Sequence, residues 1–300
     1  MLENKTISLD KSFSIGSRVA DYAQLMKMRL SSLVVFSAAM GYIIAAGNSF
    51  SWPQLFLLLL GGFLVTGSSN GFNQVIEKDL DKLMDRTAQR PLPDNRLSVT
   101  EAFIASLLMG VAGVAILWIY MNPLTGVLSL ASLLTYVLLY TPLKRITSFS
   151  VFIGAIPGAI PPMLGWVAVK NEIGLEALIL YAIQFIWQFP HFWAIAWVLD
   201  DDYRKAGFRL LPSPDGRGKS SAFQTMVYSF CLVPLVLLPQ YFGFANTLST
   251  ILLMVTSLVL IVPSVKLYRN CDMKSAQRLM FGSFIYLPVV QIVLMFGKLF

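Results

Sequence analysis

The sequence predicts an all-α membrane protein, a polytopic helical bundle with about nine transmembrane helices. Of its 300 residues, 56% are hydrophobic and only 13% are charged, whereas about 25% of the residues in a soluble domain are charged. The apolar residues form uninterrupted runs of about 18–22, which suits helices that cross a bilayer. Barrel strands would instead alternate over about ten residues. The composition therefore excludes a soluble domain, and the run length favours helices.

Nine apolar runs are predicted to span the membrane, and a polar segment precedes them. The expected spans are 30–48, 53–76, 100–120, 123–140, 149–169, 176–199, 221–241, 247–268 and 276–298. Pro53, Pro123 and the polar residues 270–274 lie at or near the breaks, as is typical of helix boundaries. We therefore expect a tail, residues 1–29, followed by one transmembrane domain, residues 30–300.

Positive charge lies almost entirely on one side of the predicted bundle. With loops assigned to alternate sides, the side of the N-terminus holds 21 of the 23 lysine and arginine residues, and the other side holds only Lys170 and Lys298. Loops rich in such residues stay in the cytoplasm. We therefore expect a multi-pass protein of the cell (inner) membrane with a cytoplasmic tail and long loops, and with its C-terminus on the opposite side. The net charge of +7 reflects this topology and does not indicate a nucleic-acid partner.

The polar stretch after the second span carries the first candidate site. Asn73, Glu77 and Asp81 recur every four residues, so on a helix their side chains share one face. Acids at this spacing repel each other, and polar residues at a membrane span mark function by default. Oxygen ligands of this kind suit Mg²⁺, which also keeps waters and substrate phosphates in its shell. The alternative is a solvated charged face.

A second acidic motif, Asp200, Asp201 and Asp202, follows the sixth span. Three consecutive residues cannot share one helical face, so we expect Asp202, and then Asp201, as metal ligands, with Asp200 in solvent. Both motifs are followed by basic residues and a Leu-Pro pair. This indicates a weak duplication into halves, 30–145 and 149–300, whose two half-sites meet over one cavity. Alternatively, these residues only cap the sixth helix and anchor it at the headgroups.

The basic residues near both motifs predict a ligand that bears phosphate. Facing acids repel each other unless cations lie between them, and cations alone would leave the basic residues without a partner. A diphosphate bridged by metal ions satisfies both sets. The residues expected to bind it are Arg86, Arg90, Lys144, Arg145 and Lys205. On charge alone, the pair Lys144 and Arg145 could instead be a topology signal.

Two apolar stretches predict the walls of a cavity within the membrane. Residues 154–166 combine glycines, which allow close helix approach, with Pro157, Pro161 and Pro162, which bend a helix and open room. Residues 187–197 are aromatic around the single histidine, His191. Such a wall could shield a cation, hold a flat macrocycle or simply pack, and the pattern does not choose between these readings.

Four motifs occur in a fixed order within a stretch from about Tyr22 to Pro212, where the chain resembles a known family, as it does less distinctly over the last three spans. They read NxxxExxxDxxMxRTxxRPL from Asn73, YTPLKR from Tyr140, PGAIPPxxGW from Pro157 and WQFPHFxAxxWxxxDDY from Trp187. In order and spacing they resemble the motifs of the UbiA superfamily of intramembrane prenyltransferases, most closely those of its protoheme IX farnesyltransferase (haem O synthase) family.

The resemblance implies a nine-helix bundle around a central cavity, with Mg²⁺ as the cofactor that helps to ionise farnesyl diphosphate. A vinyl group of haem B then captures the allylic cation, and water adds to give haem O. The implied partners are farnesyl diphosphate, haem B and membrane lipid, and the product would pass to a haem A synthase or a terminal oxidase assembly.

The resemblance also assigns roles by position. Asn73, Glu77 and Asp81 match the first metal motif, and Asp202 matches the core of the second. The five basic residues named above match positions near the diphosphate, and Lys144 is counted with the catalytic residues. The haem-binding residues that it suggests are His191 and Trp193.

This sequence departs from the family pattern at three positions, and two other functions stay open. Glu77 stands where the wider superfamily commonly has Asp, Ser150 where the pattern usually has Asn, and Asp200 where a basic residue is frequent. One alternative is a UbiA-type enzyme that prenylates an aromatic quinone precursor. The other is a transporter of a phosphorylated lipid, whose polar residues should lie near the middle of the bilayer.

Overall fold

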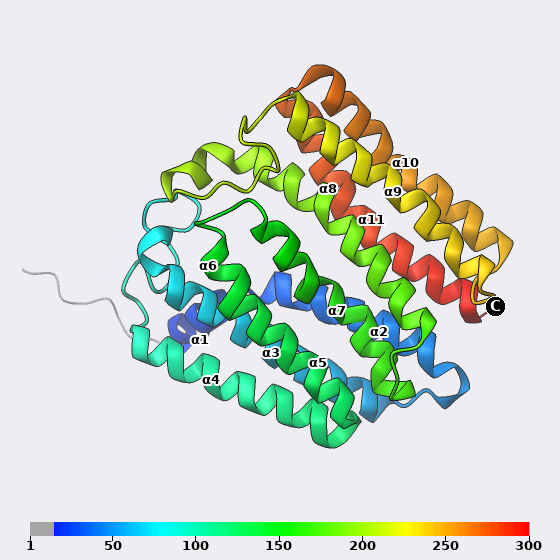
Figure 1. The fold of residues 1–300 in the computed structure, drawn as a ribbon. Coiled ribbons are helices and arrows are strands. Elements are labelled where there is room, and N and C mark those ends of the chain that lie inside the picture. Colours follow the sequence, from blue (N-terminus) through cyan, green and yellow to red (C-terminus); the bar gives the residue numbers. More distant parts are fainter. Residues whose placement is uncertain (1–14, 300) are drawn as a thin grey trace, which may run out of the picture.

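The computed structural model describes residues 15–299, and this part of the chain consists of helices joined by loops (Figure 1). Nine segments within it are long and apolar enough to cross a membrane, which confirms the predicted fold class. They are Met28–Ser49, Trp52–Asp81, Val99–Met121, Pro123–Leu143, Ser150–Lys170, Leu175–Lys205, Lys219–Tyr241, Thr247–Asn270 and Met273–Lys298.

The spans are built from longer α-helices and a few short irregular helical turns. The α-helices are α1 (Ile15–Leu25), α2 (Met28–Ala46), α3 (Trp52–Asp81), α4 (Val99–Ile116), α5 (Pro123–Leu134), α6 (Thr141–Leu143), α7 (Ser150–Lys170), α8 (Leu175–Lys205), α9 (Lys219–Tyr241), α10 (Thr247–Asn270) and α11 (Met273–Leu299). A 3₁₀ turn, η1 (Gly47–Ser49), extends α2, and π-helical turns, η2 (Leu117–Met121) and η3 (Thr135–Tyr140), extend α4 and α5. The C-terminal end of α11 lies at the end of the bundle opposite α1 and α6 (Figure 1).

Side chains cap the first turns of α4 and α5. At the start of α4 the Ser98 hydroxyl accepts the N–H of Glu101 at 3.1 Å, and the Glu101 carboxylate accepts the N–H of Ser98 at 3.3 Å, which forms a capping box. At the start of α5 the Asn122 side chain accepts the N–H of Thr125 at 2.8 Å, and Pro123 occupies the first turn. These caps satisfy N–H groups that have no partner within the helix.

The polar tail contains a helix, α1, which the charge pattern does not predict. Its Asp21 is buried and paired with Arg96, and its Arg18 lies 3.2 Å from Glu101. These ion pairs join α1 to the segment between α3 and α4 and to the first turn of α4. Residues 15–25 of the expected tail thus pack on the bundle, whereas residues 1–14 lie outside the described residues.

Two helices cross in close contact at the centre of the bundle. A Cβ added at Gly41 of α2 would overlap the carbonyl of Pro162 in α7, and one added at Gly165 of α7 would overlap the carbonyl of Ala38 in α2. Only glycine allows the two backbones to approach so closely.

The prolines of α7 deprive carbonyl groups of their helical donors, and neighbouring helices supply replacements. Pro162 has no N–H to donate to the carbonyl of Gly158, and Gln184 Nε2 of α8 donates to that oxygen at 2.8 Å. In the same way, Ser132 of α5 donates to the carbonyl of Pro157 at 3.4 Å. No water is available within a membrane, so these side chains supply the hydrogen-bond donors that the carbonyl groups need.

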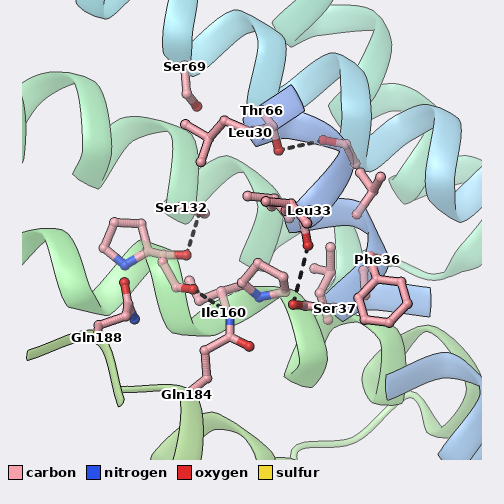
Figure 2. A pocket seen from close by; sticks show the side chains of 18 of the residues that line it. Leu30, Leu33, Phe36, Ser37, Thr66, Ser69, Ser132, Ile160, Gln184 and Gln188 are labelled. Atoms are coloured by element: carbon pink, nitrogen blue, oxygen red, sulfur yellow. Dashed lines mark hydrogen bonds between the residues drawn. The ribbon is translucent and has the colours of Figure 1, made fainter. Parts of the chain in front are cut away.

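The expected central cavity is present, with a volume of about 290 Å³, between α2, α3, α5, α7, α8 and α11. Figure 2 shows Gln184 and Gln188 of α8 facing it, opposite Leu33 of α2. Most of its lining is apolar, as in ligand pockets generally. Pro157 and Pro161 of α7 are also in the lining.

Candidate functional site

Asn73, Glu77 and Asp81 lie on one buried face at the end of α3, as their spacing predicts. Their exposed fractions are 2%, 4% and 0%, which rules out a solvated charged face. Asn73 Nδ2 donates to Glu77 Oε2 at 2.8 Å, so the amide and the first carboxylate are already oriented toward each other.

Two cations compensate the two buried carboxylates. Lys144 Nζ lies 2.5 Å from Glu77 Oε1, and Arg90 Nη1 lies 2.7 Å from Asp81 Oδ2. A buried carboxylate is costly unless it is paired, so these contacts explain how α3 can end in acids inside the protein. Asp81 Oδ1, in contrast, is buried without a hydrogen-bond partner. A carboxylate oxygen in that position is suited to a further cation.

Lys27 belongs to the same cluster, although its place in the sequence indicates only a positive charge of the tail. It has a left-handed backbone, with φ of 48°, between α1 and α2, and its Nζ donates to Asn73 Oδ1 at 3.2 Å. Burial, together with neighbouring Arg90 and Lys144, lowers the pKa of Lys27 to about 7. Three basic groups around two acids favour an anionic ligand. No spacing pattern links Lys27 to Asn73, so the sequence offers no signal for this contact.

Asp202 joins the end of α8 to the turn that follows α3. Its Oδ1 accepts the N–H of Asp85 at 2.8 Å and its Oδ2 accepts the N–H of Arg86 at 3.4 Å. Lys205 Nζ lies 2.5 Å from Asp85 Oδ2 and 3.4 Å from Asp202 Oδ1. The turn that follows the first acidic motif therefore meets the second motif at one end of the bundle, through backbone N–H groups and a lysine.

Other residues of the basic and acidic motifs face away from this cluster. The Asp201 side chain is 80% exposed and lies 2.9 Å from Arg217, and Arg145 is exposed. The expectation that Asp200 faces solvent was wrong, because Asp200 is 6% exposed and pairs with Arg204 at 2.8 Å. Successive helical residues point about 100° apart, so Asp200 is turned inward while Asp201 is turned to solvent.

The cavity begins about one helical turn before the acidic face of α3. Asn70 of α3 lines it together with Tyr136 and Tyr140 of η3. Lys144 Nζ lies 5.0 Å from the centre of the Tyr140 ring, and Thr141 accepts a hydrogen bond from Asn73 at 3.4 Å. The polar cluster is thus placed beside the mouth of an apolar cavity.

His191 lines the cavity, and Trp193 does not. Trp193 is buried on another side of α8, with its ring centre 5.4 Å from that of Phe189 and 5.1 Å from that of Tyr228. Residues two apart on a helix point about 200° away from each other, so only one of the two can face the cavity. The expectation that Trp193 binds haem beside His191 is therefore not supported by its position. Trp187, one turn before His191, lines the cavity instead.

Across residues 15–298, no three His, Cys, Asp or Glu side chains form a preformed metal cluster. Glu77 and Asp81 are engaged by Lys144 and Arg90, and Asp202 is engaged by the turn after α3. The chemistry of the site is therefore that of balanced acid–base pairs beside one free carboxylate oxygen.

A sequence profile of the UbiA prenyltransferase family matches residues 34–287. The chain belongs to the UbiA prenyltransferase family. Protoheme IX farnesyltransferase of Cytophaga hutchinsonii is 48% identical over 286 residues, which cover 95% of this chain and 100% of that protein. The protein of the same name from Flavobacterium psychrophilum is 43% identical over 292 residues, which cover 95% of this chain and 96% of that protein. The family and these relatives identify the chain as an intramembrane prenyltransferase.

Solved structures of the family have the same fold. A structure of digeranylgeranylglyceryl phosphate synthase matches with a TM-score of 0.79 at 17% identity, covering 94% of this chain and 99% of that one. A UbiA homologue from Archaeoglobus fulgidus, solved with GPP and Mg²⁺, matches with a TM-score of 0.64 at 16% identity. The match covers 91% of this chain and 99% of that one.

Proposed function

We propose that this chain transfers the farnesyl group of farnesyl diphosphate to a vinyl group of haem B, with addition of water, to give haem O. The observation that carries the proposal is the 48% identity to the Cytophaga protoheme IX farnesyltransferase over that protein's whole length. The site suits such a reaction, because paired acids and cations lie beside an apolar cavity that also contains the chain's single histidine.

The diphosphate would be bound by an exchange of ionic partners. Lys144 and Arg90 now contact Glu77 and Asp81. Both basic side chains can turn to phosphate oxygens, which frees the two carboxylates for a metal ion. Lys27 is a third basic residue within the cluster, and a bound anion would favour its charged form. This exchange keeps every buried charge compensated, which a buried ionic site requires.

Mg²⁺ would be held by Asn73, Glu77 and Asp81, with Asp202 on the α8 side. The free Oδ1 of Asp81 supports this assignment, and the homologue solved with GPP and Mg²⁺ shows that the fold can hold both. Bound Mg²⁺ would stabilise the negative charge that develops on the leaving diphosphate. We do not extend the metal site to Asp201, because its carboxylate is exposed and paired with Arg217.

Three basic residues at the rim would guide the diphosphate to the cluster. Arg86 and Lys205 lie where the turn after α3 meets α8. Arg145 follows Lys144 and is exposed. Exposed cations at the entrance of a site raise the local concentration of an anionic substrate.

The haem would lie in the cavity with His191 next to its iron. His191 precedes Asp202 by eleven residues, which is about 16 Å along the axis of α8 at 1.5 Å per residue. The vinyl groups lie at the rim of the porphyrin, so iron near His191 would leave a rim group free to approach the diphosphate cluster. The apolar walls would keep water from the allylic cation until the new carbon–carbon bond has formed.

We also propose that the end of the bundle with the acidic motifs faces the cytoplasm, across the cell inner membrane. The asymmetry of the lysine and arginine residues supports this orientation. The product, haem O, would pass to a haem A synthase or to a terminal oxidase assembly.

The decisive experiment supplies the full-length protein in lipid nanodiscs with Mg²⁺, radiolabelled farnesyl diphosphate and either haem B or 4-hydroxybenzoate. We expect label only in a farnesylated, hydroxylated haem, identified by mass spectrometry. Prenylated 4-hydroxybenzoate in place of that haem would instead identify an enzyme of quinone synthesis. Movement of labelled lipid phosphate across vesicles without any product would identify a transporter.

A further inference from the structure

Ser283 of α11 holds two rings of α8. Its carbonyl oxygen accepts the Trp187 Nε1–H at 3.1 Å, and its hydroxyl oxygen lies 2.8 Å from His191 Nδ1. The two rings belong to successive turns of α8 and stack on each other, with centres 4.4 Å apart and planes at 21°. Ser283 is fully buried, so both rings are fixed from inside the helix interface.

The hydrogen bonds of Ser283 determine which nitrogen of His191 carries the proton. A serine hydroxyl has one hydrogen, and Ser283 donates it to the carbonyl of Met280 at 2.6 Å. Toward His191 the hydroxyl oxygen can therefore only accept, which requires a proton on Nδ1. In a neutral ring this leaves Nε2 with a free lone pair.

The surrounding packing keeps Ser283 in this position. A Cβ added at Gly282 would lie 2.9 Å from the carbonyl oxygen of Val259 in α10. The backbones of α10 and α11 are thus in contact next to Ser283, so α11 cannot shift toward α10 to break the bond to His191.

We infer that Ser283 is a positioning residue for the acceptor substrate. It holds His191 in the Nδ1–H form, with Nε2, on the other side of the ring, available to bind the iron of haem. This inference rests on the proposed function. Histidines that bind metals commonly donate their second N–H to an oxygen that fixes the tautomer and the ring orientation, and a neutral imidazole nitrogen is a frequent iron ligand. Ser283 would thus fix the register of the macrocycle relative to the diphosphate cluster.

The first test requires no substrate. His191 is the only histidine of the chain, so ¹⁵N-histidine labelling and NMR of the full chain in detergent report on this ring alone. We expect a protonated Nδ1 and an unprotonated Nε2 in the wild type and in Ser283→Thr, and a mixture of both tautomers in Ser283→Ala. The same tautomer in the wild type and in Ser283→Ala would overturn the inference.

The second test measures haem binding and uses a matched serine as its control. Ser264 of α10 is also fully buried, and its hydroxyl donates to the carbonyl of Ile261 at 2.8 Å, but it does not line the cavity. With ferric haem B we expect an imidazole-bound iron spectrum in the wild type and in Ser264→Ala. Ser283→Ala should lose this signature and bind haem about 10–100-fold more weakly, with an unchanged KM for farnesyl diphosphate.

The two tests separate this inference from the proposed function. If the wild type farnesylates haem and Ser283→Ala equals Ser264→Ala in spectrum and in KM for haem, the positioning role is refuted and the function stands. If the wild type forms no farnesylated haem, the proposed function fails, and the haem spectra of the wild type, Ser264→Ala and Ser283→Ala then decide the positioning role on their own.

Discussion

Glu77 and Asp81 are almost completely buried, yet each has a cation within 2.7 Å. Because the charges are balanced pair by pair, the cluster is tolerated before any ligand binds. The same pairing makes each residue dependent on its partner. A substitution that removes one charge therefore alters both the ligand set and the local balance.

Asp81→Asn should lower turnover about 10²–10³-fold, which is the effect of removing one group that stabilises developing charge. Asn has nearly the same shape as Asp, so the helix should remain folded. The control is Asp79→Asn on the same helix, whose carboxylate is exposed and paired with Lys82. Near-normal turnover of Asp81→Asn in nanodiscs would remove Asp81 from the metal site.

Lys27→Met should raise the KM for farnesyl diphosphate about tenfold, because it removes one charge-assisted contact worth roughly 1.5 kcal/mol. Arg29→Met removes an exposed charge from the first turn of α2, two residues from Lys27, and should leave KM unchanged. Lys27→Arg should restore part of the loss. Equal KM values for the two methionine variants would assign Lys27 to topology alone.

The predictability of these residues depends on how far apart in the chain their partners lie. Asn73, Glu77 and Asp81 could be placed together because a helical repeat connects them. Lys27 could not, because it reaches Asn73 from a turn with a positive φ between α1 and α2. Asp200 was wrongly expected in solvent. Which of three consecutive aspartates faces inward depends on the rotation of α8 about its axis, and the neighbouring helices set that rotation.

At the scale of the elements, α7 shows how a membrane helix can contain three prolines. The carbonyl of Gly158 bonds to Gln184, whose Oε1 in turn accepts from Gln291 of α11 at 2.8 Å. Three helices are therefore joined by amide hydrogen bonds at the edge of the cavity. Gln184 therefore supports the fold and also lines the cavity.

Gln184→Leu should lower the free energy of unfolding by about 1–2 kcal/mol, because it leaves the Gly158 carbonyl and the Gln291 amide without partners. The measurement is an SDS titration in mixed micelles. Gln240→Leu, at the exposed end of α9, should have little effect. A loss no greater than that of Gln240→Leu would mean that water or another side chain satisfies these groups.

The nine spans could be predicted because each depends on a local apolar run. The π-helical turns η2 and η3 could not, since the apolar runs around residues 117–121 and 135–140 look the same for α- and π-helices. α1 was missed for a related reason. Its ion pairs to Arg96 and Glu101 are with residues more than seventy positions away.

At the scale of the whole molecule, the acids and cations of both halves meet at one end of the bundle. The division into halves, 30–145 and 149–300, stays a prediction, although α3 and α8 each bring an acidic motif to the same place. Their connection through Asp202 uses only groups of the protein. The fold of this end should therefore not depend on a metal ion.

Removal of divalent cations with EDTA should stop turnover while leaving the protein folded, because Lys144 and Arg90 already neutralise the buried acids. Added Mg²⁺ should restore activity fully. Turnover and the thermal unfolding midpoint are to be measured on one preparation. Activity that survives chelation would argue against Mg²⁺, and a large fall in the midpoint would show that the ion also supports the fold.

The contact between α2 and α7 has a consequence for how a rigid, planar substrate gains access. At Gly41 and Gly165 the two backbones already touch, so this wall is fixed. The side of α11 differs, because Phe284 there both lines the cavity and is exposed at the surface, while Ser283 and the contact with α10 hold the α11 backbone. Such a substrate would pass laterally from the lipid past the Phe284 side chain, without movement of α11.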